Sequence, residues 1–76
     1  MKTVKEYVKE GVPLMMDGKY EEAEEAFQMA IAIDPNNHEG WFHLSIVLFI
    51  NRQYTEAIDA RTKAQELIEK LDSGQG

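Results

Sequence analysis

The sequence predicts an all-α fold of four helices, arranged as two similar helical hairpins. Two observations lead to this prediction. Apolar residues recur at the three- and four-residue spacing of amphipathic helices in successive segments. In addition, residues 4–37 resemble residues 38–71 when the two segments are aligned with an offset of 34. No segment alternates apolar and polar residues over the length of a typical strand.

The first predicted helix follows a capping box formed by Thr3 and Glu6. Its apolar stripe comprises Val4, Tyr7, Val8, Gly11, Val12 and Met15. Pro13 lies within this stripe, and a proline inside a helix removes a backbone donor and clashes with the preceding turn. We therefore expect the first helix either to bend or to begin late. The dipeptide Asp17-Gly18 ends it.

The second predicted helix begins near Tyr20 and ends at Asp34-Pro35. Its stripe comprises Tyr20, Ala23, Ala26, Phe27, Ala30 and Ile31. Its other side carries Glu21, Glu22, Glu24 and Glu25, which interact favourably with the N-terminal end of a helix.

The third and fourth predicted helices complete the second hairpin. Asn36 and Glu39 are expected to cap the third helix, which is apolar on nearly every side and should therefore be covered by other elements. The fourth helix carries a stripe of Tyr54, Ala57, Ala60, Ala64, Leu67, Ile68 and Leu71. Residues 72–76 are expected to form a frayed tail.

The 34-residue offset aligns small residues with small residues and an aromatic residue with an aromatic residue. Tyr20 aligns with Tyr54, and Ala23, Ala26 and Ala30 align with Ala57, Ala60 and Ala64. Alanines at these positions allow two helices to approach closely, and the aromatic residues fill the space beside them. Two helices in a 34-residue period are the signature of one kind of helical repeat.

The chain resembles the tetratricopeptide repeat (TPR) family over residues 4–71. The residues that carry the resemblance are Gly11, Gly18, Tyr20, Ala23, Phe27, Ala30 and Pro35 in the first unit, and Trp41, Leu44, Ser45, Tyr54, Ala57 and Ala64 in the second. The resemblance implies one domain, residues 1–76, with repeats at about 4–37 and 38–71. It also implies two antiparallel helix-turn-helix hairpins in a short right-handed superhelical stack. Three positions depart from the family pattern: Pro13 lies inside the first helix, Glu10 aligns with Leu44 and should be exposed, and Arg61 stands where the first unit has the aromatic residue Phe27.

In this family the first helix of each hairpin lines a concave groove. The resemblance assigns to it Lys5, Val8, Val12, Met15, Met16, Glu39, Phe42, Ile46, Phe49 and Ile50. Eight of these ten residues are apolar, and Val8 and Val12 stand at two positions where carboxylate-binding members have polar residues. We therefore expect a protein–protein interaction module whose groove binds a hydrophobic peptide or an amphipathic helix. Met15 and Met16 either line this groove or are buried in the domain.

The alternative is a self-associating, homodimeric or engineered scaffold. Repeat arrays usually need about three units to bury a continuous core. Two units leave Leu67, Ile68 and Leu71 poorly covered. The chain is therefore expected either to be a piece of a larger or engineered protein or to form an oligomer such as a dimer.

Composition, charge and residue spacing argue against several other functions. A net charge of −6 argues against binding to nucleic acid or to an anionic membrane. The absence of cysteine and of a secretory signal favours the cytoplasm. His38 and His43 are five residues apart and point in different directions on a helix, so no metal or cofactor site is expected. The acidic run Glu21–Glu25 is interpreted as a solvated face, and no enzymatic activity is expected.

Overall fold

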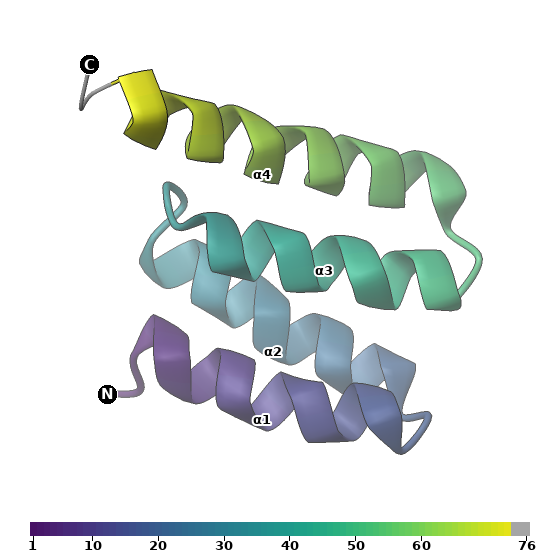
Figure 1. Ribbon diagram of the computed structural model, residues 1–76. Coiled ribbons are helices and arrows are strands. Elements are labelled where there is room, and N and C mark those ends of the chain that lie inside the picture. The colour runs from purple at the N-terminus through teal and green to yellow at the C-terminus, as the bar shows by residue number, and fades with distance from the viewer. Residues whose placement is uncertain (74–76) are drawn as a thin grey trace.

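The computed structural model describes residues 1–73. Within this range the chain forms four α-helices and no strand (Figure 1). They are α1 (Val4–Met16), α2 (Tyr20–Ile33), α3 (His38–Ile50) and α4 (Tyr54–Ser73). The predicted all-α class is therefore confirmed.

The four helices form two packed hairpins. Helix α1 packs against α2, and α3 packs against α4, while α3 also contacts α2 and α1. Figure 1 shows α1 and α4 at opposite ends of the stack. These contacts bury Leu44, Val47 and Leu48 of α3. Phe42, Phe49 and Ile50 stay exposed, so the expectation that other elements cover this helix holds for only part of its apolar surface. The right-handed superhelical arrangement stays a prediction.

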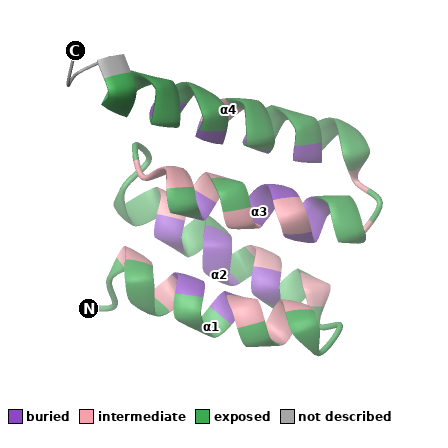
Figure 2. Ribbon diagram, viewed as in Figure 1, coloured by how far each residue is buried: buried purple, intermediate pink, exposed green. Residues whose placement is uncertain are grey.

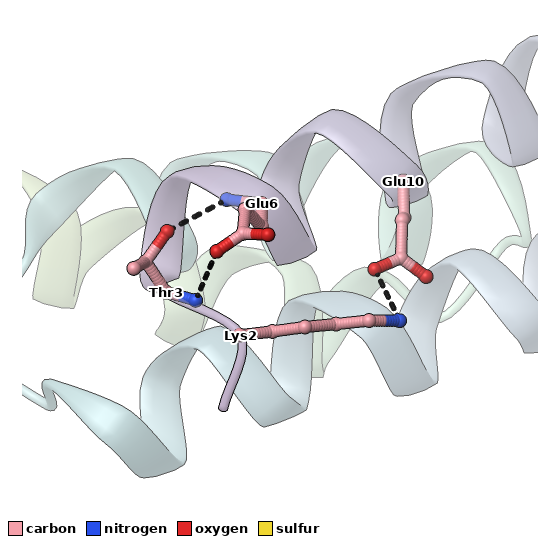
Figure 3. Close-up of polar contacts among 4 residues, drawn as sticks. All are labelled: Lys2, Thr3, Glu6 and Glu10. Atoms are coloured by element: carbon pink, nitrogen blue, oxygen red, sulfur yellow. Dashed lines mark hydrogen bonds and ion pairs between the residues drawn. The ribbon is translucent and has the colours of Figure 1, made fainter.

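Helix α1 begins as predicted. The amide of Glu6 donates to Oγ1 of Thr3 at 3.2 Å, and the amide of Thr3 donates to Oε1 of Glu6 at 3.0 Å (Figure 3). The capping box satisfies two amide groups at the helix start. The expectation of a late start is wrong, because the helix runs from Val4 to Met16 with Pro13 inside it.

The turn between the hairpins is capped one residue later than predicted. Asn37, rather than Asn36, is the N-cap of α3, and its Oδ1 accepts a hydrogen bond from the amide of Glu39 at 2.9 Å. The amide of Asn36 instead donates to Oδ1 of Asp34 at 3.1 Å. Asp34 therefore uses its side chain to shape the turn, which leaves the capping position to the next asparagine.

The two intrahairpin turns are copies of each other. Gly18 and Arg52 are 34 residues apart and both have positive φ, 82° and 65°. After each, an amide reaches back five residues to a carbonyl: Lys19 to Leu14 at 2.9 Å, and Gln53 to Leu48 at 2.8 Å. This pattern closes the C-terminal end of a helix with a left-handed residue. The backbone thus repeats with the same period as the sequence.

The core lies between the helices and is built largely from small residues (Figure 2). Phe27 and Val47 are its largest fully buried side chains. The aligned alanines are all buried: Ala23, Ala26, Ala30, Ala57, Ala60 and Ala64. Their burial confirms that small residues mark the close approach of the helices.

Helix α4 is longer than predicted. It has 20 residues against 13 in α3, and it continues through Ser73. Asp72 and Ser73 are therefore helical instead of belonging to a frayed tail. The rest of the predicted tail, residues 74–76, lies outside the described residues.

Candidate interaction surface

An apolar crevice lies between α3 and α4. It has a volume of about 400 Å³. Its lining residues are Ser45, Ile46, Phe49 and Ile50 from α3, and Ala57, Ile58, Arg61 and Thr62 from α4. Phe49 is 63% exposed and Ile58 is 64% exposed, so two large apolar side chains border it in contact with water. Exposed apolar clusters of this kind typically mark interaction sites.

Small residues form the floor of the crevice. Ala57 and Ser45 are buried where α3 and α4 approach each other. The hydroxyl of Ser45 donates to the carbonyl of Phe42 at 2.6 Å, which satisfies this buried polar group within its own helix. Larger side chains at either position would fill the hollow.

Two lining residues of the crevice, Phe49 and Arg61, contact neighbouring aromatic rings. The rings of Phe49 and Tyr54 meet edge to face, with centroids 5.3 Å apart. The guanidinium of Arg61 lies 6.0 Å from the ring centroid of Phe42, at the outer limit of a cation–π contact. Arg61 is the charged member of the lining set. The crevice therefore presents an apolar surface with one positive charge.

The first-unit residues of the predicted groove have different environments. Val8 is buried and belongs to the core cluster, so its assignment to the partner-binding surface is corrected. Val12 and Met15 are half-buried against that core, whereas Met16 is 79% exposed. The sequence did not decide whether Met15 and Met16 are buried or line the groove. The structure places Met15 against the core and leaves Met16 exposed to solvent.

The second-unit residues of the predicted groove are more open. Phe42 is 39% exposed and Ile50 is 42% exposed, and Ile46 is half-buried. Ile46, Phe49 and Ile50 also line the crevice. The structure therefore brings part of the predicted groove together with residues of α4 that were not assigned to it.

The three residues predicted to mediate self-association also differ in solvent exposure. Leu67 is buried, at 5% exposure, and is not available to a second copy. Ile68 is 37% exposed and Leu71 is 55% exposed. Leu67 is covered because it continues the stripe of α4 that faces α3, while Leu71 lies on the part of α4 that extends farther.

Sequence reasoning missed the contribution of α4 to the crevice. It assigned binding residues to the first helix of each hairpin, so Ala57, Ile58 and Thr62 were not considered. One signal was present. Ile58 aligns with Glu24, and an isoleucine at a position that is acidic in the first unit indicates an altered environment.

Among the described residues, no three His, Cys, Asp or Glu side chains could hold a metal ion together. His43 donates from Nδ1 to the carbonyl of Glu39 at 2.8 Å, and its ring centroid lies 5.5 Å from that of Phe27. These contacts give His43 a packing role.

An ion pair joins Lys2, which precedes α1, to Glu10 within that helix. The Lys2 ammonium lies 2.7 Å from the Glu10 carboxylate (Figure 3). This hydrogen bond raises the pKa of Lys2 above its usual value of 10.5. Glu10 is exposed, as expected from its alignment with Leu44. The pair makes the outer side of α1 polar.

Within residues 1–73, none of the helices is both long and apolar enough to cross a bilayer.

Two family comparisons match the chain. One tetratricopeptide repeat model matches residues 5–37, and a second matches residues 26–59. The chain belongs to the tetratricopeptide repeat family. The first match agrees with the predicted first unit to within one residue, whereas the second is phased differently, running from α2 through α3 into α4. No significant match was found among curated proteins or solved structures. TPR units generally mediate protein–protein interactions, so this is the functional class of the chain.

Proposed function

We propose that this TPR chain binds a hydrophobic peptide or amphipathic helix of a partner protein and that it has no catalytic activity. The surface is the α1–α3 strip, which we define as Val12, Met16, Ile46 and Ile50, flanked by Lys5 and Glu39. Each α1 residue is 34 positions before its α3 counterpart, so the six side chains form matching rows on two helices in contact.

The observation that carries the proposal is the exposure of Met16 and Ile50. They are 79% and 42% exposed, and they lie at equivalent positions of the two units. Apolar side chains that project from neighbouring helices can receive the apolar side of a helix. Methionine is flexible and polarisable, which suits a surface that adapts to its ligand. Lys5 and Glu39 supply opposite charges that can orient a bound segment.

A selection of displayed peptides against the purified protein tests the proposal. We expect enriched peptides to be apolar at helical spacing and to lose binding to Met16→Glu, because the substitution places a charge in the strip and lies outside the crevice lining. Met29→Glu is the matched control, because Met29 is also an exposed methionine, at 48%, but lies on α2. Peptides that lose binding equally to both variants, or to neither, would contradict the assignment.

Self-association is a second candidate, and the exposed end of α4 favours it. Helix α4 has 20 residues and α3 has 13. The apolar residues Ile68 and Leu71 are exposed near the C-terminal end of the longer helix. Pairing of this extension with a second copy would remove both side chains from water. Sedimentation equilibrium of the protein and of Leu71→Glu tests it, since a dimer should dissociate on substitution. A cytoplasmic location stays a prediction from the sequence.

A further inference from the structure

The two ends of the helix stack have opposite character. The outward side of α1 carries the exposed residues Glu6, Lys9, Glu10 and Pro13. The outward side of the second hairpin carries the crevice, with Phe49 and Ile58 more than 60% exposed. A polar end is suited to water, whereas an apolar end is suited to another protein surface.

The chain itself shows what covers a surface of this kind. Subtracting 34 from the eight crevice positions gives Gly11, Val12, Met15, Met16, Ala23, Glu24, Phe27 and Gln28, of which the first four lie on α1 and the last four on α2. Ala23 and Phe27 are both 0% exposed, and α3 packs on this side of the hairpin. The crevice is thus the second hairpin's counterpart of a surface that binds a helix in the first.

Contacts of α3 identify the residues that make this packing possible. Gly40 allows close approach, since a Cβ there would lie 3.2 Å from Cγ1 of Ile31 and 3.6 Å from Cβ of Ala30. His43, three residues later, stacks near Phe27. Leu44 and Val47 enter the core cluster. We count contact positions from Gly40 as the first. The packed side of α3 then has a small residue at the first position, the His43 ring at the fourth, and the apolar residues Leu44 and Val47 at the fifth and eighth.

One substitution changes what the second hairpin can accept. Arg61 stands where the first hairpin has Phe27. A helix seated on the crevice as α3 is seated on the first hairpin would place its fourth-position residue beside this guanidinium. A carboxylate at that position would form a charge-assisted hydrogen bond with Arg61, in partly apolar surroundings that strengthen it.

We propose that the α3–α4 crevice binds a helix of a partner protein with a small residue, an acidic residue three positions later, and apolar residues four and seven positions after the small one. The acidic residue pairs with Arg61, and the apolar residues cover Phe49 and Ile58. This site differs from the α1–α3 strip of the proposed function, which it touches at Ile46 and Ile50.

A second copy of the chain does not meet these requirements. In head-to-tail stacking, α1 would supply Glu6, Lys9, Glu10 and Pro13 at the four contact positions. Lys9 would then face Arg61, and Glu10 would enter an apolar position. If two copies paired through the same surface, each would present an arginine instead of a carboxylate. Charge complementarity therefore selects a different partner.

Synthetic helical peptides of about 18 residues test the site. Each peptide has alanine at the first contact position and leucine at the fifth and eighth, with a soluble Lys/Gln/Ala remainder. Three versions carry Glu, Gln or Lys at the fourth position. Titration into the ¹⁵N-labelled protein, followed by NMR, gives both the dissociation constant and the residues whose resonances move.

We expect saturable shifts centred on Ser45, Phe49 and Ile58, with the Glu peptide binding about tenfold more tightly than the Lys peptide, the ratio that corresponds to one charge-assisted pair. Arg61→Glu should reverse this order. Arg61→Phe, which restores the first-hairpin residue, should abolish the difference between the Glu and Lys peptides. Lys63→Glu makes the same charge change outside the crevice lining and should preserve the original order.

Other outcomes would overturn the proposal. Equal affinity of the Glu and Lys peptides for the unmodified protein would remove the role of Arg61. Shifts centred on Val12 and Met16 would place binding in the α1–α3 strip, which would support the proposed function and reject this site. Conversely, Met16→Glu should leave binding of the Glu peptide unchanged. Shifts at Phe49 and Ile58 that grow with protein concentration in the absence of peptide would show that a second copy occupies the crevice instead.

Discussion

Gly11 and Phe27 are in such close contact that the glycine is required. A Cβ added to Gly11 would lie 2.4 Å from Cε1 of the Phe27 ring, closer than carbon atoms approach in proteins. Phe27 is 0% exposed and is enclosed by the core, so its ring has little room to withdraw. The small residue on α1 and the large one on α2 therefore form a matched pair that sets the distance between the two helices.

We predict that Gly11→Ala destabilises the protein by about 1–2 kcal/mol. Overpacking of a core costs about 1–3 kcal/mol, and the better helix propensity of alanine returns somewhat less than 1 kcal/mol. Urea denaturation followed by circular dichroism measures the difference. Gly40→Ala is the control, because its nearest contact, at 3.2 Å, is the γ-carbon of half-buried Ile31, which can adjust. Equal losses for both variants would argue against a specific fit between Gly11 and Phe27.

The positive φ angles of Gly18 and Arg52 lead us to predict a stabilising substitution at Arg52. Both have positive φ at equivalent turns, but a side chain with a Cβ adopts this conformation at a cost of about 1 kcal/mol. Arg52→Gly should therefore raise the midpoint of thermal unfolding by a few degrees for a domain of this size. Gly18→Ala provides the opposite change and should lower it, because nothing lies within 4 Å to offset the backbone strain. An unchanged midpoint for both variants would show that the turns relax.

The two asparagines before α3 separate capping from turn formation. Asn37→Ala removes the side-chain acceptor for the amide of Glu39 and should cost about 1 kcal/mol. Asn36→Ala should have a much smaller effect, because Asn36 is bonded through its backbone amide. Chemical denaturation of the two variants measures both values. The reverse order would mean that Asn36 is the working cap in solution.

The sequence was sufficient for the fold because small and aromatic residues recur at the positions where helices touch. Gly11, Ala23 and Ala57 leave few other ways to pack, so their spacing carries the architecture. The capping residue was predicted one position early, because Asn36 and Asn37 are chemically the same and the choice depends on the carboxylate of Asp34. The local sequence pattern alone does not show which of the two asparagines caps the helix.

The candidate surface was harder to predict than the fold. Exposure depends on which neighbour covers a side chain, and equivalent residues differ here for that reason. Val8 is buried at 9%, while Phe42, its counterpart 34 residues later, is 39% exposed. The helical period places both on the same side of a first helix, but packing of α3 against the first hairpin covers only one of the two. The role of Ile58 was missed for the same reason.

The Lys2–Glu10 pair predicts a measurable titration. Its hydrogen bond raises the pKa of Lys2, so the protonated form is favoured in the folded state. Any stabilisation from the pair is fully present below the usual value of 10.5 and is lost as pH rises through the higher folded-state pKa. NMR titration of the lysine side chains should show Lys2 with a raised midpoint, and Glu10→Gln should lower that midpoint. A Lys2 midpoint unaffected by Glu10→Gln would show that the pair is not formed in solution.

Met15 and Phe49 give the most direct test of how packing distinguishes the two hairpins. They are equivalent residues, but Met15 is half-buried against the core and Phe49 is 63% exposed at the crevice. Met15→Ala should cost about 1–2 kcal/mol, less than the roughly 2–5 kcal/mol lost when a fully buried methionine is truncated, because the site is only partly enclosed. Phe49→Ala removes a larger side chain and should cost less than 1 kcal/mol, chiefly its edge contact with Tyr54. Urea denaturation at several protein concentrations measures both values. A larger loss for Phe49→Ala that appears only at high concentration would mean that another copy covers the crevice, whereas the same loss at every concentration would mean that this side chain is buried within the chain itself.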